Sequence, residues 1–508
     1  MKNLILNITE LWDRGGLKAK CAKGAMVLGI GTFGGRTLQF LRILILARIL
    51  TPEQFGIIAI VIASMMVLEA FTEVGVKQSV IQNKRGAERE YLNVAWWFQS
   101  LRGLGLFAIA ILAAPWISSF YGRPELLRLF QVSYLSILFR GFISPRVYVL
   151  EKEYKFGRSV LLIQGSGVLG TVITIVAAFM IRSVWALVIG FVAEAAVLCL
   201  LSYALVPFLP SFRIDRECLR ELMKFARGMF GLPILTWISL GADVLVLGKI
   251  VADEELGMYS LAVHLVSLPI ILFSQIINPV LLPGFAHKQD DRNALCRAVL
   301  QITRGAATFA IPLVALLASC ASGVLLLAYG SQYVAVAVPC GILCLLILVR
   351  VEALIPSTLY FAVGRPGLHR RFVMLRALII VALIYPAIVH LGLSGAAAVM
   401  VLGHFTALLM QIFWCRRIID LKFSRYIRCY IPGLLLALPV ITTAGLLMIF
   451  GIGSPVLVLI VCAAVLIASY AGYLAKFSLS KFQPVPFVGR KETAGTLDIA
   501  ASIETEDV

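Results

Sequence analysis

The sequence predicts an all-α, polytopic membrane protein, and two observations lead to that class. Of the 508 residues, 60% are hydrophobic and 14% are charged, with a mean hydropathy of +0.94; an ordinary globular domain is about 25% charged. Apolar runs of roughly 20 to 28 residues recur along the chain, and each is long enough to cross about 30 Å of hydrocarbon. We therefore expect a bundle of about 14 transmembrane helices.

The expected spans follow one another through short polar connections that usually contain glycine or proline. Proline inside a run, as at Pro233, Pro269 and Pro312, does not exclude a helix, because neighbouring helices can satisfy the freed carbonyl groups. The approximate bounds of the spans are 24–49, 55–79, 92–118, 125–149, 159–181, 184–206, 223–250, 255–283, 299–327, 334–362, 371–391, 394–414, 428–450 and 455–475.

Lysine and arginine are distributed unevenly between the connections. With the N-terminus in the cytoplasm, the even-numbered connections and both tails hold roughly 30 of these residues, whereas the odd-numbered connections hold roughly two, Arg123 and Arg182. This bias predicts that both termini are cytoplasmic. The net charge of +18 then reflects membrane topology, and we expect no nucleic-acid partner. The first residues, MKNLILNITELW, resemble a short amphipathic helix on the inner leaflet.

The ten cysteines show no metal-ligand spacing. Cys340 and Cys344 lie one helical turn apart inside an apolar run, which is typical of packing residues. Nearly all cysteines fall within spans or on the expected cytoplasmic side, where disulfides are rare. We therefore expect no metal site and no disulfide framework.

Two segments of the chain repeat each other. ARILTPEQFGIIAIVIA, from Ala47, aligns without gaps with GKIVADEELGMYSLAVH, from Gly248, and a weaker match places Pro145 over Pro356. Each copy of the stronger match joins an odd span to an even one. Parallel repeats with a substrate site between two halves are typical of transporters.

The repeat gives an expected domain organisation. Two six-span lobes form the main body, followed by two further spans and a disordered cytoplasmic tail. The expected bounds are 1–23 for the N-terminal segment, 24–206 for the first lobe, 207–222 for a cytoplasmic linker, 223–414 for the second lobe, 428–475 for spans 13 and 14, and 476–508 for the tail.

Several segments together resemble a known family. They are LARILTPEQFGIIAIV, FTEVGVKQSVIQNK, LNVAWWFQS, RVYVLEKEYKFGRSVLL and GMYSLAVHLVSLP. The chain is similar over about residues 20 to 475 to the polysaccharide exporter and oligosaccharide flippase family, of the superfamily that includes multidrug extruders and lipid II flippases. The resemblance implies a V-shaped bundle of two lobes in the bacterial inner membrane. It also implies alternating-access transfer of undecaprenyl-pyrophosphate-linked oligosaccharide to the periplasmic leaflet, by a monomer, with polymerase or export proteins as further partners.

Charged residues inside the expected spans are candidates for the transport site. Arginines outnumber acids there, and a water-filled cleft lined by arginine suits a pyrophosphate, which guanidinium groups bind bidentately. As substrate contacts we predict Arg36, Arg42, Arg102, Arg140 and Arg350. As coupling or gating groups we predict Glu69, Glu73, Glu194, Asp243 and Glu352. For each group, a structural ion pair that fixes helix register is the competing reading.

The stretch SMMVLEAFTEVGVKQ shows most clearly the choice between a transport role and a structural ion pair. Glu69, Glu73 and Lys77 are spaced four residues apart, so on a continuous helix they share one face. We expect that face to look toward the cleft and to meet arginines of the neighbouring spans. Glu73 and Lys77 could instead pair with each other.

The remaining arginines, the histidines and Asp243 within the expected spans give less specific predictions. Arg146, Arg227, Arg304 and Arg376 are expected near the cytoplasmic ends of spans, where they snorkel to lipid phosphate. His264 and His404 are expected to be packing residues. Asp243, in SLGADVLVLGK, could bind a coupling cation or make a polar contact.

No motif for nucleotide binding is visible, which leaves a proton, a sodium ion or the membrane potential as the energy source. We expect no cofactor and no catalytic residue. A multidrug-cation antiporter of the same fold is one alternative, and an arginine-rich cleft argues against it. A membrane glycosyltransferase or polymerase is another, but the longest expected periplasmic connection is only about seven residues, which leaves little room for an active site.

Overall fold

The computed structural model describes residues 17–72, 75–153, 155–229, 231–286, 289, 291–451 and 453–476. The described part of the chain is helical and contains no strand, which confirms the all-α class. The expected amphipathic helix at the N-terminus, the disordered tail after Lys476, and Glu73 lie outside these residues. The expected domain bounds stay a prediction.

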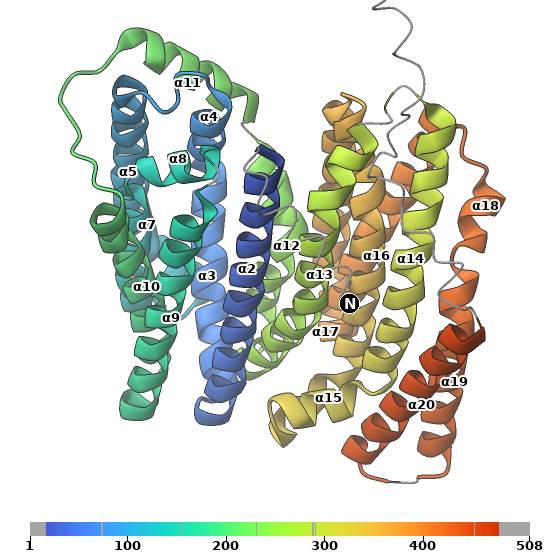
Figure 1. Cartoon of the computed structure of the whole chain (residues 1–508). Coiled ribbons are helices and arrows are strands. Elements are labelled where there is room, and N and C mark those ends of the chain that lie inside the picture. The colour runs from blue at the N-terminus through green and yellow to red at the C-terminus, as the bar shows by residue number, and fades with distance from the viewer. Residues whose placement is uncertain are drawn as a thin grey trace, which may run out of the picture.

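The helices form two groups that stand next to each other (Figure 1). The first group contains α2 (Leu17–Ile49), α3 (Pro52–Thr72), α4 (Val76–Gln82), α5 (Arg89–Tyr121), α6 (Leu126–Ser133), α7 (Leu135–Gly141), α8 (Arg146–Lys152), α9 (Phe156–Ile181) and α10 (Val184–Leu205). The connecting helix α11 (Arg216–Met229) packs on α4 and α5. The first group is therefore continuous with the linker that leads to the second.

The second group contains α12 (Leu232–Ile250), α13 (Asp253–Ala286), α14 (Arg292–Ser319), α15 (Ala321–Ala328), η1 (Ser331–Val336), α16 (Ala337–Ala362) and α17 (Pro366–Ile419). The last helices, α18 (Phe423–Arg428), α19 (Ile431–Ile449) and α20 (Pro455–Lys476), pack at its outer side against α14 and α15.

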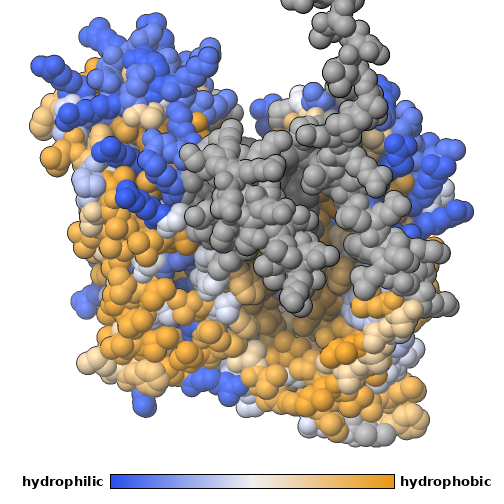
Figure 2. Space-filling model, viewed as in Figure 1, coloured by the Kyte–Doolittle hydropathy of each residue, from blue (hydrophilic) through white to orange (hydrophobic). Residues whose placement is uncertain are grey.

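Eleven described helices are long and apolar enough to cross a membrane, or up to twelve if the bent pair Leu126–Gly141 and Arg146–Lys152 is one span. The expected number of about 14 is not confirmed by this count. One difference lies in α17, which contains two expected spans that meet at Gly392, where the backbone is non-helical with φ 56° and ψ −138°. Figure 2 shows hydrophobic residues over most of the visible face and hydrophilic residues gathered near α4 and α11.

Two expected spans are broken rather than continuous. The span expected over 55–79 ends at Thr72, and a separate helix, α4, begins after Gly75, whose φ is 70°. The span expected over 125–149 divides into α6, α7 and α8. The left-handed Gly75 lies directly before α4, and Pro145, which caps α8, supplies no backbone N–H to continue a helix from α7.

The two groups are joined most closely where α3 crosses α13. A Cβ atom at Gly56 would lie 1.9 Å from the carbonyl oxygen of Asp253, and one at Gly257 would lie 1.7 Å from that of Pro52. These glycines occupy equivalent positions in the sequence repeat. Only glycine permits such an approach of two backbones, so the repeat supplies the contact between the two groups.

Polar contacts surround this crossing, at what we call the closed end. Arg123 forms an ion pair with Asp253, and the Lys249 ammonium donates to the carbonyl of Phe120. The Tyr121 hydroxyl donates to the Leu245 carbonyl at 3.3 Å, and Arg48 donates to the Leu327 carbonyl at 2.7 Å. Each of these contacts joins the first group to the second.

We expect Gly257→Ala to lower the thermal unfolding midpoint of the purified protein. The added methyl group would clash with the backbone of α3, and overpacking of this kind costs about 1–3 kcal/mol. Gly305→Ala, inside α14, is a matched control because nothing lies within 4 Å of its Cβ position; there helix propensity favours alanine by about 0.5–1 kcal/mol. Equal shifts of the midpoint in the two variants would contradict the close crossing.

Candidate functional site

A cavity of about 310 Å³ lies inside the first group, between α2, α9 and single residues of α4, α8 and α10. We call it the N cavity. Its polar lining includes Arg36, Gln39, Lys77, Gln164 and Glu194. Small residues on α2 bring α9 close, since a Cβ atom at Gly35 would lie 1.6 Å from the Gln164 side-chain oxygen. The glycines of α2 therefore position the polar face of α9 beside Arg36.

The two predicted arginines of α2 meet different partners, Arg36 in this cavity and Arg42 beside it. Arg36 donates to Gln39 at 2.9 Å and forms no ion pair with a described residue. Arg42, in contrast, pairs with Glu194 across 3.3 Å, with their side chains 21% and 27% exposed. Helix α2, which carries both arginines, also packs on α13 of the second group. The first group thus presents its arginine-bearing helix to the second.

The charged stripe expected on the second span does not exist as one helical face. The break after Thr72 separates Glu69 on α3 from Lys77 on α4. Lys77 pairs with Glu151 of α8 at 2.8 Å, and both residues line the N cavity. The expected sharing of a face by Glu69 and Lys77 is therefore wrong, because the sequence pattern assumed an unbroken helix across Gly75.

Glu69 lines a separate hollow between the two groups, with a volume of about 400 Å³. We call this hollow the middle cavity. Its other walls include Met66 on α3 and Pro233, Thr236 and Trp237 on α12. Glu69 is thus placed where the two groups face each other.

Two other predicted arginines of the first group line none of these cavities. The Arg102 guanidinium donates to the carbonyl of Thr72 at 3.1 Å, at the end of α3. Arg140 lies over the ring of Phe191, 5.5 Å from its centroid. These contacts hold α3, α5, α7 and α10 together.

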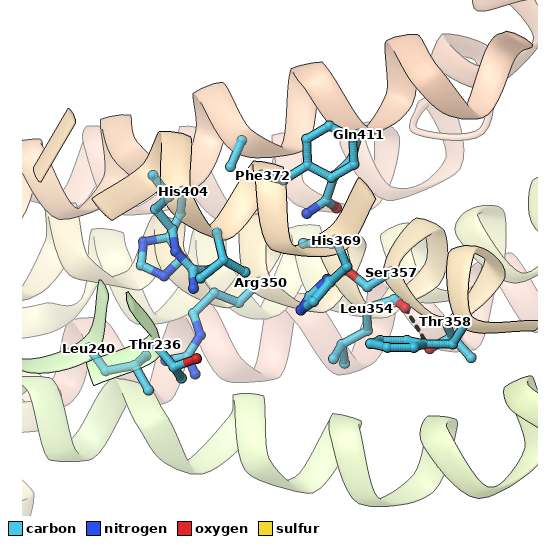
Figure 3. A pocket seen from close by; sticks show the side chains of 15 residues that line it. Thr236, Leu240, Arg350, Leu354, Ser357, Thr358, His369, Phe372, His404 and Gln411 are labelled. Carbon is cyan, nitrogen blue, oxygen red and sulfur yellow. Dashed lines mark hydrogen bonds between the residues drawn. The ribbon is translucent and has the colours of Figure 1, made fainter. Parts of the chain in front are cut away.

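A third cavity, of about 480 Å³, lies inside the second group between α12, α16 and α17. We call it the C cavity. Arg350, His369 and His404 line it (Figure 3), together with Arg376. Thr236 and Leu240 of α12 line both the C cavity and the middle cavity. Arg350 therefore belongs to a different cavity from Arg36.

Sequence reasoning placed two C-cavity residues wrongly or incompletely. Arg376 was expected to snorkel near a helix end, but it lies well inside α17 and lines the cavity. His404 is buried, as expected of a packing residue, yet it also faces this hollow. The sequence feature that could have indicated this cavity was the excess of arginine over acid along α16 and α17.

The two deepest predicted acids lie in side-chain clusters within the second group. Asp243 is 1% exposed and accepts a hydrogen bond from the Tyr259 hydroxyl at 2.9 Å. Glu352 is fully buried and accepts from Tyr430 at 3.1 Å and from Tyr426 at 3.4 Å. Neither acid lines the three cavities described above.

Within the described residues, no group of three or more His, Cys, Asp or Glu side chains could hold a metal ion. The described cysteines are free, and Cys340 and Cys344 are both buried. The polar chemistry of the site therefore comes from arginine, lysine, histidine and carboxylate side chains.

The solved structures similar to this chain define the class of the fold. A lipid II flippase, MurJ, in an inward closed conformation, aligns with a TM-score of 0.74 at 14% identity and covers 89% of this chain and 98% of its own. An inward-facing multidrug resistance MATE transporter aligns with a TM-score of 0.59 at 15% identity, over 76% and 94%. The chain thus has the fold of the superfamily that contains these transporters.

The family itself follows from the sequence comparisons. The family model described as "Polysaccharide biosynthesis protein" matches residues 45–338, which is more than half of the chain, and the protein belongs to this family. The teichuronic acid biosynthesis protein TuaB of Bacillus subtilis strain 168 is 23% identical over 68% of this chain and 72% of its own. The succinoglycan biosynthesis transport protein ExoT of Rhizobium meliloti strain 1021 is 26% identical over 60% of each chain. The expected family resemblance is confirmed.

We predict that Arg42 and Glu194 stabilise the first group as a pair. Partly exposed ion pairs contribute about 0–1 kcal/mol, so a double-mutant cycle of Arg42→Gln and Glu194→Gln should give a coupling energy near the upper end of that range. The control cycle uses Arg292 and Asp420, which lie 3.9 Å apart and are 70% and 78% exposed. Equal coupling energies from thermal unfolding in the two cycles would contradict a structural Arg42–Glu194 pair.

Proposed function

We propose that this protein moves an undecaprenyl-pyrophosphate-linked oligosaccharide from the cytoplasmic to the periplasmic leaflet of the bacterial inner membrane. The observation that carries the proposal is Arg36, a guanidinium group on α2 that lines a cavity and has no acidic partner among the described residues. Charged groups at membrane depth are costly and mark substrate pathways. The family and the flippase fold support the same assignment.

In this proposal the N cavity and the middle cavity receive the polar part of the substrate. Arg36 contacts the pyrophosphate, since guanidinium groups bind phosphate oxygens through paired hydrogen bonds. Arg42 is held beside the cavity by Glu194, which neutralises its charge. The polyprenyl tail remains in lipid and passes between helices, because its transfer from hydrocarbon to a polar cavity would be unfavourable.

The closed end gives the proposed cycle its direction. We place both termini in the cytoplasm, as the distribution of lysine and arginine predicts, so the closed end faces the periplasm. Release of substrate then requires the α3–α13 crossing and the Arg123–Asp253 pair to separate while the opposite ends of the groups approach. This is alternating access between two states of one bundle.

Transport in this proposal involves no covalent chemistry and draws on a proton or sodium gradient. Glu69 is the candidate that faces the middle cavity, and Glu194 is the candidate in the N cavity. Asp243 and Glu352 are buried behind tyrosine hydroxyls, so an ion reaches them only if these side chains move. Polymerase or export proteins are the proposed consumers of the translocated oligosaccharide.

The test is translocation of a labelled undecaprenyl-pyrophosphate oligosaccharide in proteoliposomes. We expect Arg36→Ala to lower the initial rate by about tenfold or more, because a hydrogen bond to a charged group contributes about 1.5–3 kcal/mol. Arg304→Ala is the matched control, since Arg304 is exposed and lines none of the three cavities. Equal rates for Arg36→Ala and wild type would remove Arg36 from the transport path.

We expect Glu69→Gln to make the rate insensitive to an imposed ion gradient, because an amide cannot exchange a proton or balance a sodium ion. The same vesicles are measured with and without a proton gradient, and then with a sodium gradient. A gradient response equal to that of wild type would exclude Glu69 as the coupling group. Absence of translocation by the wild type, with extrusion of an organic cation instead, would favour a multidrug antiporter of this fold.

A further inference from the structure

The C cavity holds positive charge that no acidic side chain among the described residues neutralises. Arg350 on α16 and Arg376 on α17 both line it, together with His404. The lining contains no aspartate or glutamate, and neither arginine forms an ion pair with a described residue. Glu352 is only two residues from Arg350, but it points to Tyr426 and Tyr430, since positions i and i+2 lie on different helical faces.

Residues that line the cavity also carry buried polar atoms that lack hydrogen-bond partners among the described residues. These atoms include the Nε donor of Arg376, the Nε2 atom of His404 and the Oε1 atom of Gln411. His404 and Gln411 are only 3% and 4% exposed. Figure 3 shows Arg350, His369 and His404 directed into the same space. Buried polar groups without partners are unfavourable, so this lining indicates a ligand that supplies the missing partners.

The unpartnered atoms differ in their hydrogen-bonding roles. The Nδ1 atom of His404 lies 2.8 Å from the Met400 carbonyl, and a carbonyl only accepts, so Nδ1 carries the hydrogen. In the neutral ring Nε2 is then an acceptor, as is Gln411 Oε1. The cavity therefore offers guanidinium donors for an anion and, beside them, acceptors for hydroxyl groups. Pyrophosphate has no carbon-bound hydroxyl groups to give these acceptors, whereas a sugar has several.

We propose that the C cavity binds a sugar that carries a carboxylate. The guanidinium groups of Arg350 and Arg376 bind the carboxylate, and His404 and Gln411 accept hydrogen bonds from ring hydroxyls. A volume of about 480 Å³ far exceeds one carboxylate and accommodates a sugar ring. This inference rests on the proposed function, because it makes an acidic sugar of the transported oligosaccharide the occupant. Entry is from the middle cavity, which shares Thr236 and Leu240 with the C cavity.

The test measures ligand-dependent thermal stability of the full purified chain in detergent. The probes are sodium glucuronate, glucose, inorganic phosphate, pyrophosphate and sodium chloride, at matched ionic strength. We expect glucuronate to raise the unfolding midpoint by about 3 °C or more, as a ligand specific for the folded state does, and glucose and chloride to raise it much less. Equal or larger stabilisation by phosphate or pyrophosphate would overturn the sugar-carboxylate assignment in favour of a phosphate site.

Three variants make the result specific to this cavity. Arg376→Gln should abolish the glucuronate shift, and Arg376→Lys should restore part of it. Arg304→Gln, at an exposed position outside the cavity, should keep the full shift. A glucuronate shift that persists in Arg376→Gln would overturn the proposal.

Stability without ligand separates a binding role from a structural one. Since Arg376 is a half-buried charge with no acidic partner among the described residues, we expect the ligand-free midpoint of Arg376→Gln to equal or exceed that of wild type. A lower midpoint would assign Arg376 a structural role. The binding measurement requires no translocation, so its outcome is independent of the vesicle assay: glucuronate binding without translocation would contradict only the transport function.

Discussion

The close crossing of α3 and α13 is the contact on which the rest of the architecture depends. Gly56 and Gly257 allow each backbone to approach the other helix within distances that any side chain would prevent. Around them, the apolar residues of both helices join one hydrophobic core, including Ile60 and Tyr259. The two groups are thus held together at one end. The polar cavities lie away from this crossing.

The three cavities show how one bundle can hold many charges in a hydrophobic environment. Arg42 and Glu194 neutralise each other, as do Lys77 and Glu151. Asp243 and Glu352 are buried against tyrosine hydroxyls. Arg36, Arg350 and Arg376 have no acidic partner in the described part of the chain, and all three line cavities. The paired charges therefore join neighbouring helices, and the three arginines without an acidic partner among the described residues face cavities.

The class of protein, most helix positions and the repeat could be read from the sequence because they depend on local patterns. Long apolar runs define helices, and the aligned Gly56 and Gly257 turned out to contact each other's helix. The break at Gly75 was missed because glycine is common inside membrane helices. The sequence also did not show which charged residues share a cavity. Helical periodicity gives the face of a helix on which a residue lies, but it does not say which other helix packs against that face. Arg376 is the clearest example.

The short link between α11 and α12 limits how the two groups can move. Helix α11 is fastened to the first group, since Asn83 donates to Glu221 at 2.7 Å and Arg85 donates to Glu217 at 3.0 Å. It ends at Met229, and α12 begins at Leu232 after Gly231, whose φ is 86°. A change in the angle between the two groups would therefore be concentrated in the backbone dihedral angles around Gly231, and a β-branched residue at this position would be strained by its positive φ.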